Sequence, residues 1–163
     1  LFANIDGGFS VYLNSPIQDF YVRYDAQGNE VERIPNLVSN YDDDFVFFAD
    51  QLVLDGANNI YILHPEALLK FGPEGNFINR ISSEGDAEDQ LRNPNALAAD
   101  GRGRLYVSDF RMVKVFDGDG RFIKTFPYPE NGSIFFNMVI TDDDQIIAMD
   151  RNNNQVVIYQ INE

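Results

Sequence analysis

Three consecutive carboxylates, Asp42, Asp43 and Asp44, are a dense group of candidate metal ligands in the sequence, and Tyr41 and Phe45 flank them. Carboxylate oxygens are the ligands that hard cations such as calcium prefer. Neighbouring carboxylates in a loop are also commonly just solvated. Two interpretations therefore stay open: a site for calcium or another divalent cation, and an acidic surface loop.

Two aspartate–arginine pairs occupy matching places directly after an apolar segment. Asp109 precedes Arg111 by two residues, and Asp150 is followed at once by Arg151. Such a charged pair can recognise a polar ligand, or it can tie neighbouring structural units together through charge-assisted hydrogen bonds. We favour the role of tying neighbouring units together and keep ligand recognition as the alternative.

His64 is the single histidine of the chain, and Pro65 follows it. One imidazole cannot build a histidine-rich zinc site. The sequence has no cysteine, no Gly-x-Ser-x-Gly motif and no glycine-rich phosphate loop. We therefore assign no catalytic residue and keep His64 as a candidate for ligand binding.

The charge of the chain argues against several partners. With 26 acidic and 12 basic residues the formal net charge is −14, and the basic residues are scattered singly. Such a surface repels phosphate backbones, so we predict no nucleic-acid binding. The apolar runs are too short to span a bilayer, so we predict no membrane insertion. The acidic, cysteine-free composition favours an extracytoplasmic location, periplasmic or secreted.

The candidate residues lie within four imperfect repeats. Each of the first three has an Asp-Gly turn before an apolar, β-rich segment, and a weaker fourth copy begins at Thr141-Asp142. The turns are Asp6-Gly7, Asp55-Gly56 and Asp100-Gly101. A second marker, an aromatic residue, recurs about every 45 residues, within the range of propeller blades. These aromatics are Tyr24, Phe71, Phe116 and Tyr159.

Short segments between the markers are bounded by Gly, Asn, Asp and Pro, which is typical of hairpins and not of helices. Each repeat therefore predicts a four-stranded sheet, too small to stand alone, that stacks radially on its neighbours. The prediction is an all-β protein, a single β-propeller domain over residues 1–163. Its blades are expected at about 1–35, 46–82, 94–127 and 135–163, and the last blade lacks its outermost strand.

The third repeat carries a family resemblance. It runs Asn93-Pro94-Asn95-Ala96, then Leu105-Tyr106-Val107-Ser108-Asp109 and Val113-Lys114-Val115-Phe116-Asp117, and it resembles the NHL repeats of β-propellers. Closed rings of that family usually hold six blades. The resemblance implies that this chain is a C-terminal portion of such a ring, completed by missing N-terminal blades or by self-association. Related propellers include lyases, lactonases, RNA binders and interaction modules, so it implies a fold more than an activity.

In propellers, ligands usually meet the face built from the loops between second and third strands and between blades. Here that face is expected to carry the candidate residues Asn14, His64, Asp109, Arg111, Asp150 and Arg151. The first functional hypothesis is a non-enzymatic binding or scaffold propeller that engages a protein or polar ligand and requires no cofactor. A divalent-cation-dependent lactonase or hydrolase is the first alternative. A structural subunit that assembles through open blade edges is the second.

Overall fold

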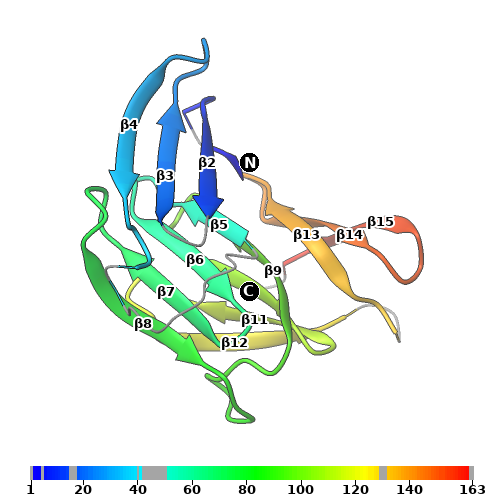
Figure 1. The fold of residues 1–163 in the computed structure, drawn as a ribbon. Coiled ribbons are helices and arrows are strands. Elements are labelled where there is room, and N and C mark those ends of the chain that lie inside the picture. Colours follow the sequence, from blue (N-terminus) through cyan, green and yellow to red (C-terminus); the bar gives the residue numbers. More distant parts are fainter. Residues whose placement is uncertain are drawn as a thin grey trace.

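The computed structural model describes residues 2–4, 6–14, 18–39, 41, 51–128 and 132–161. Within these ranges the chain forms fifteen β-strands, and no helix there is long and apolar enough to cross a membrane. The strands make four antiparallel sheets that follow one another along the chain as the blades of a β-propeller (Figure 1). The predicted all-β propeller is confirmed.

The first three blades each have four strands in sequence order. Blade 1 holds β1 (Phe2–Ala3), β2 (Phe9–Asn14), β3 (Asp19–Tyr24) and β4 (Glu30–Pro35). Blade 2 holds β5 (Gln51–Leu54), β6 (Ile60–His64), β7 (Ala67–Phe71) and β8 (Phe77–Ser83). Blade 3 holds β9 (Pro94–Ala99), β10 (Leu105–Asp109), β11 (Met112–Phe116) and β12 (Phe122–Pro127).

Blade 4 has three strands among the described residues, β13 (Phe135–Ile140), β14 (Gln145–Asp150) and β15 (Gln155–Gln160). The expected missing outermost strand is confirmed for this part of the chain. The first strands of the blades meet at the inside of the array. There the side chain of Gln51 on β5 accepts a hydrogen bond from Leu97 N of β9 and donates one to Phe136 O of β13, at 3.1 Å each.

Aspartate side chains close the turns that the sequence marks. Asp55 Oδ1 accepts hydrogen bonds from the backbone N–H groups two and four residues further on, both at 2.9 Å. Asp100 and Asp117 make the same two contacts. A short carboxylate side chain that bonds to the backbone just after it stabilises a tight turn locally. Asp117 to Gly120 is therefore the turn between β11 and β12, with Gly120 at a φ of 92°.

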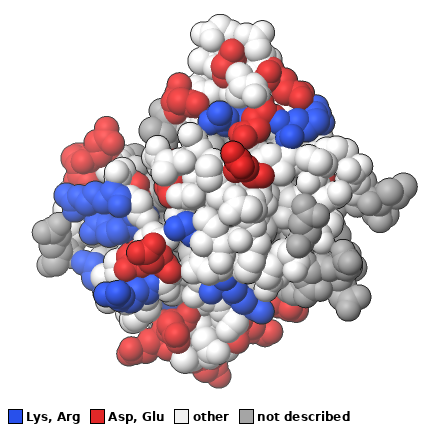
Figure 2. Space-filling view, turned by 90° about the vertical axis from the view of Figure 1, so that its left-hand side faces the viewer, with Lys and Arg blue, Asp and Glu red and all other residues white. Residues whose placement is uncertain are grey.

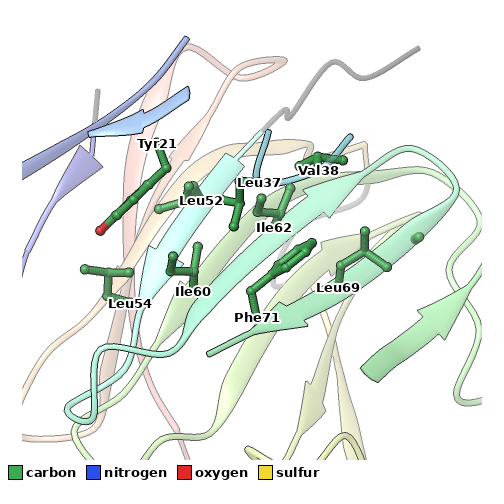
Figure 3. Packing of buried hydrophobic residues seen from close by; sticks show 10 residues of the cluster. Tyr21, Leu37, Val38, Leu52, Leu54, Ile60, Ile62, Leu69 and Phe71 are labelled. Carbon is green, nitrogen blue, oxygen red and sulfur yellow. The ribbon is translucent and has the colours of Figure 1, made fainter. Parts of the chain in front are cut away.

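The apolar core lies between successive blades. One cluster joins blades 1 and 2, where Tyr21 of β3 lies by Leu52 and Leu54 of β5 (Figure 3). A second joins blades 2 and 3, and a third joins blades 3 and 4. Because each small sheet buries a face only against its neighbour, the blades depend on one another for stability.

Charged side chains of both signs are interspersed on the side of the molecule that Figure 2 shows. Some ion pairs in the described part of the chain join neighbouring strands or lie within one strand, such as Arg23 with Glu32 at 3.5 Å and Arg33 with Glu30 at 2.6 Å. Exposed pairs of this kind contribute little to stability.

Candidate functional site

Asp109 fastens the connection between blades 2 and 3 to the end of β10. Its carboxylate is buried and accepts hydrogen bonds from the backbone N–H groups of Arg92, at 3.0 Å, and Asn93, at 2.7 Å. The ammonium of Lys114 lies 3.5 Å from the second carboxylate oxygen and donates a further bond to Gln90 O of the same connection. Both acceptor oxygens of Asp109 are thus engaged inside the protein.

Asp150, at the end of β14, holds the connection between blades 3 and 4 in the same way. Its carboxylate accepts hydrogen bonds from Ser133 Oγ at 2.7 Å, Ile134 N at 3.2 Å and Asn153 Nδ2 at 2.7 Å. Blade 1 uses Asp19, at the start of β3, which accepts bonds from Val38 N and Ser39 Oγ. We call these contacts the carboxylate clamps. They hold each inter-blade connection against a hairpin end.

Burial of the Asp150 carboxylate favours its neutral form, but the hydrogen bonds from Ser133 and Asn153 outweigh burial and lower the pKa to about 2. The unfolded chain, with an ordinary pKa near 3.8, therefore takes up this proton at a higher pH than the folded protein does. The stability that Asp150 contributes is fully present above that ordinary pKa. It is lost as the pH falls towards the folded value.

We expect Asp150→Asn to flatten the acid limb of the stability profile. Between pH 5 and pH 2 the wild-type protein should lose about 2 kcal/mol more of its free energy of unfolding than the variant does, because only the wild type has this carboxylate to protonate. Urea unfolding at a series of pH values measures the difference. The exposed Asp142→Asn is the matched control, and equal slopes for both variants would contradict the assignment.

Arg111 and its neighbour Phe110 form the two-residue turn between β10 and β11, and both side chains are exposed. The ring of Phe110 has two guanidinium groups over it, those of Arg92 and Arg111, each 5.2 Å from the ring centroid. Arg92 also pairs with Asp86, whereas no described carboxylate lies within ion-pair distance of Arg111. Arg111 therefore presents a cation on an aromatic surface.

Arg151 has a similar arrangement on blade 4. Its guanidinium lies 4.9 Å from the ring centroid of Phe136, which is itself half exposed. The two aspartate–arginine pairs of the sequence thus separate in space. The carboxylates clamp connections, and the guanidinium groups lie on exposed phenylalanine rings.

A pocket of about 230 Å³ opens where the β10–β11 turn, the β12–β13 connection and the β14–β15 turn meet. It combines a guanidinium, an aromatic ring, amides and a phenol. Its lining is Asn93, Asn95, Phe110, Arg111, Tyr128, Gly132, Ser133, Ile134 and Asn152. Burial is the main cause that raises the pKa of Tyr128 to about 12, so its phenol is neutral. Groups of these types bind polar ligands by hydrogen bonds and stacking.

The other candidates lie apart from this pocket. His64 is buried at the end of β6, and its Nδ1 accepts a hydrogen bond from Glu66 N at 3.1 Å. Asn14 ends β2 on blade 1. Asp42, Asp43 and Asp44 lie outside the described residues. Within the described ranges, no group of three histidine, aspartate or glutamate side chains is arranged to hold a metal ion.

Phe110, Tyr128 and Asn152 were not anticipated as pocket residues. The sequence could have indicated that Phe110 is exposed, because a large aromatic residue in a two-residue turn has little room to be buried. Tyr128 and Asn152 lie in loops of the face where ligands were expected, but nothing in the sequence singled out these two side chains, because they meet only through the fold.

No family model matches this chain, and no curated protein is similar to it in sequence. Solved structures are similar in fold. The WD40 domain of Pan2 from Neurospora crassa is 12% identical with a TM-score of 0.52, over 98% of this chain and 48% of that one. A streptogramin B lyase is 10% identical with a TM-score of 0.49, over 96% and 55%. The chain thus spans about half the length of each.

Similarity at this level of identity shows the fold alone. Four successive blades, their inter-blade cores and the likeness to the WD40 domain define the class of this protein as a β-propeller. Its candidate site is the pocket between blades 3 and 4.

Proposed function

We propose that this chain is a non-enzymatic binding or scaffold module that engages a protein or another polar ligand through the loop-rich end of its blades. One observation carries the proposal. The carboxylates of Asp109 and Asp150, which could have served chemistry, are occupied by the clamps, whereas Phe110 and Arg111 of the adjoining turn are exposed beside a pocket. A rigid scaffold that presents exposed turn residues is typical of binding sites.

The geometry of Phe110 and Arg111 supports a ligand with a planar polar or anionic group. A guanidinium donates several hydrogen bonds in one plane, which fits carboxylates and backbone carbonyls. Phe110, with 43% of its surface exposed, offers a face for stacking or apolar contact. Arginine is among the residues that dominate binding energy at protein interfaces, and phenylalanine is enriched there.

The backbone of Arg111 provides a second support. Its φ of 72° lies in the left-handed region, which costs a residue other than glycine roughly 1–2 kcal/mol. Glycine would relieve this cost, but the turn holds an arginine. Retained backbone strain of this kind motivates a functional role for the side chain.

Arg111→Gly is expected to separate binding from stability. The free energy of unfolding should stay unchanged or rise by about 1 kcal/mol, because relief of the left-handed strain is partly offset by the larger chain entropy of glycine. Affinity for a ligand of the pocket should fall at least tenfold. Thermal unfolding and surface plasmon resonance on the same preparations measure the two effects.

Short immobilised peptides of acidic, basic and uncharged composition are the probes for this experiment. Peptides retained by the wild-type protein should be lost by Arg111→Gly and Phe110→Ala, and should be kept by the exposed control Ile123→Ala on blade 3. Failure to retain any peptide class, or equal retention by the wild type and both pocket variants, would overturn the proposal. So would metal-dependent turnover of a panel of lactones and esters.

The proposal requires no cofactor. Calorimetric titration with calcium, magnesium and zinc tests the alternative of a divalent-cation-dependent hydrolase, because a saturable heat of binding would favour that alternative. NHL-type kinship and an extracytoplasmic location form part of the same proposal. They rest on the motif of the third repeat and on the acidic, cysteine-free composition.

A further inference from the structure

Every internal junction of this propeller pairs two different kinds of blade face. In blade 3, Leu105, Val107 and Phe116 face blade 2, and we call this side the leading face. Tyr106, Val113 and Val115 face blade 4, and we call this side the trailing face. All of these side chains are fully buried. At each junction the trailing face of one blade covers the leading face of the next.

Blade 4 has a trailing face that nothing described covers. The hairpin register matches Val156 to Val113 and Ile158 to Val115, because Met149 pairs with Val156 as Ser108 pairs with Val113. Val113 and Val115 are 0% exposed, whereas Val156 and Ile158 are 64% and 60% exposed. The same sheet positions therefore carry the same residue type without a covering blade.

Further apolar residues enlarge this surface. Met149 and Val139 are exposed on the same side of the blade, since Met149 pairs with Val156 and Val139 pairs with Ile147. Phe136, Met149 and Val156 line an open hollow of about 470 Å³. An apolar surface of this extent on one sheet is typical of an interaction surface.

The leading face of blade 1 is likewise not covered by another blade of the described chain. Phe9, Val11 and Tyr24 occupy the register positions of Leu105, Val107 and Phe116, because Phe9 pairs with Tyr24 as Leu105 pairs with Phe116. The rings of Phe9 and Tyr24 stack at 4.8 Å. Leu13 and Val31 on this blade are each 51% exposed.

The two end faces do not cover each other within one chain. Residues of both are exposed, and none of the hydrophobic clusters of the described residues joins blade 4 to blade 1.

We propose that a second copy of this chain covers both faces, with the trailing face of blade 4 of each copy packed on the leading face of blade 1 of the other. At the junctions within this chain, the surface that packs on a trailing face is a leading face.

Two copies related by a twofold axis form this head-to-tail contact twice and leave no end face exposed. Closure of such a ring fixes the number of copies, whereas an unclosed head-to-tail contact would continue into a filament. Each copy carries a charge of −14, so the two copies repel each other. Salt screens that repulsion, and the dimer should therefore become tighter as ionic strength rises.

Light scattering after size exclusion tests the proposal on the 163-residue chain. The wild type should have twice the mass of the 18.6 kDa chain. Leu13→Glu on the leading face and Val156→Glu on the trailing face should each give the mass of one chain, with circular dichroism unchanged. Ile123→Glu, an exposed apolar position on blade 3, should stay a dimer.

A mixture of the two single variants distinguishes head-to-tail packing from other dimers. Leu13→Glu keeps its trailing face and Val156→Glu keeps its leading face, so the mixture should recover dimers through one intact junction. A symmetric dimer of blade 4 faces would leave Leu13→Glu dimeric by itself. A monomeric wild type, a mass other than twice that of the chain, or no recovery on mixing would overturn the proposal.

Discussion

Asp109→Ala is expected to lower the free energy of unfolding by about 3–5 kcal/mol, because it leaves a buried ammonium without its counter-ion. Lys114 has only 8% of its side chain exposed and lies 3.5 Å from the carboxylate of Asp109. The substitution also removes the acceptor for Arg92 N and Asn93 N. Urea unfolding followed by far-ultraviolet circular dichroism measures the loss, which is a large fraction of the stability of a typical domain.

Two further variants separate the causes of this loss. Asp109→Asn keeps an oxygen for the two N–H groups and removes only the charge, so its loss should be smaller. Adding Lys114→Met to Asp109→Ala removes the unpaired ammonium and should restore much of the stability, which a double-mutant cycle quantifies. A loss for Asp109→Ala no larger than for the exposed control Asp119→Ala would contradict the clamp.

Phe116→Ala is the second substitution with a large expected effect, again about 3–5 kcal/mol. Phe116 is 0% exposed at the junction of blades 2 and 3, and it makes an edge contact with Phe122 at 5.9 Å between ring centroids. Removal of the ring leaves a cavity between two sheets that cannot collapse without moving a blade. Thermal and urea unfolding of the variant measure the effect.

Phe110→Ala is the matched control for Phe116→Ala, since both remove a phenylalanine ring from blade 3. Phe110 lies in an exposed turn, so its loss should change the free energy of unfolding by less than about 0.5 kcal/mol. Phe116→Ala should therefore lose stability, whereas Phe110→Ala should lose ligand binding. Equal losses of stability would contradict the assignment of the core to the junctions.

The sequence predicted the strands and turns of this protein well because their causes are local. The β-rich segments expected after the Asp55-Gly56 and Asp100-Gly101 turns are β6 and β10. An aspartate that bonds to the N–H groups two and four residues further on needs no distant partner. Strand alternation and turn chemistry act within a few residues, so both can be read from the chain directly.

The candidate site was predicted only in part. Asp109 and Asp150 were correctly identified as matching residues, but their partners come from connections 16 or 17 residues away in the sequence. The sequence coupled each aspartate to the nearest arginine. The β10–β11 turn separates them, and Arg111 lies on the Phe110 ring instead.

The aspartate–arginine pairs therefore show which features of this protein the sequence determines and which depend on the fold. The sequence by itself determined an all-β repeat, its blade order and a last blade without an outermost strand, because hydrophobic alternation and turn residues encode these locally. Only the tertiary structure decided that the aspartates are clamps, that the arginines lie on exposed rings, and that Val156 and Ile158 are exposed while Val113 and Val115 are buried. Equivalent residues differ here because burial depends on whether a neighbouring blade covers the face.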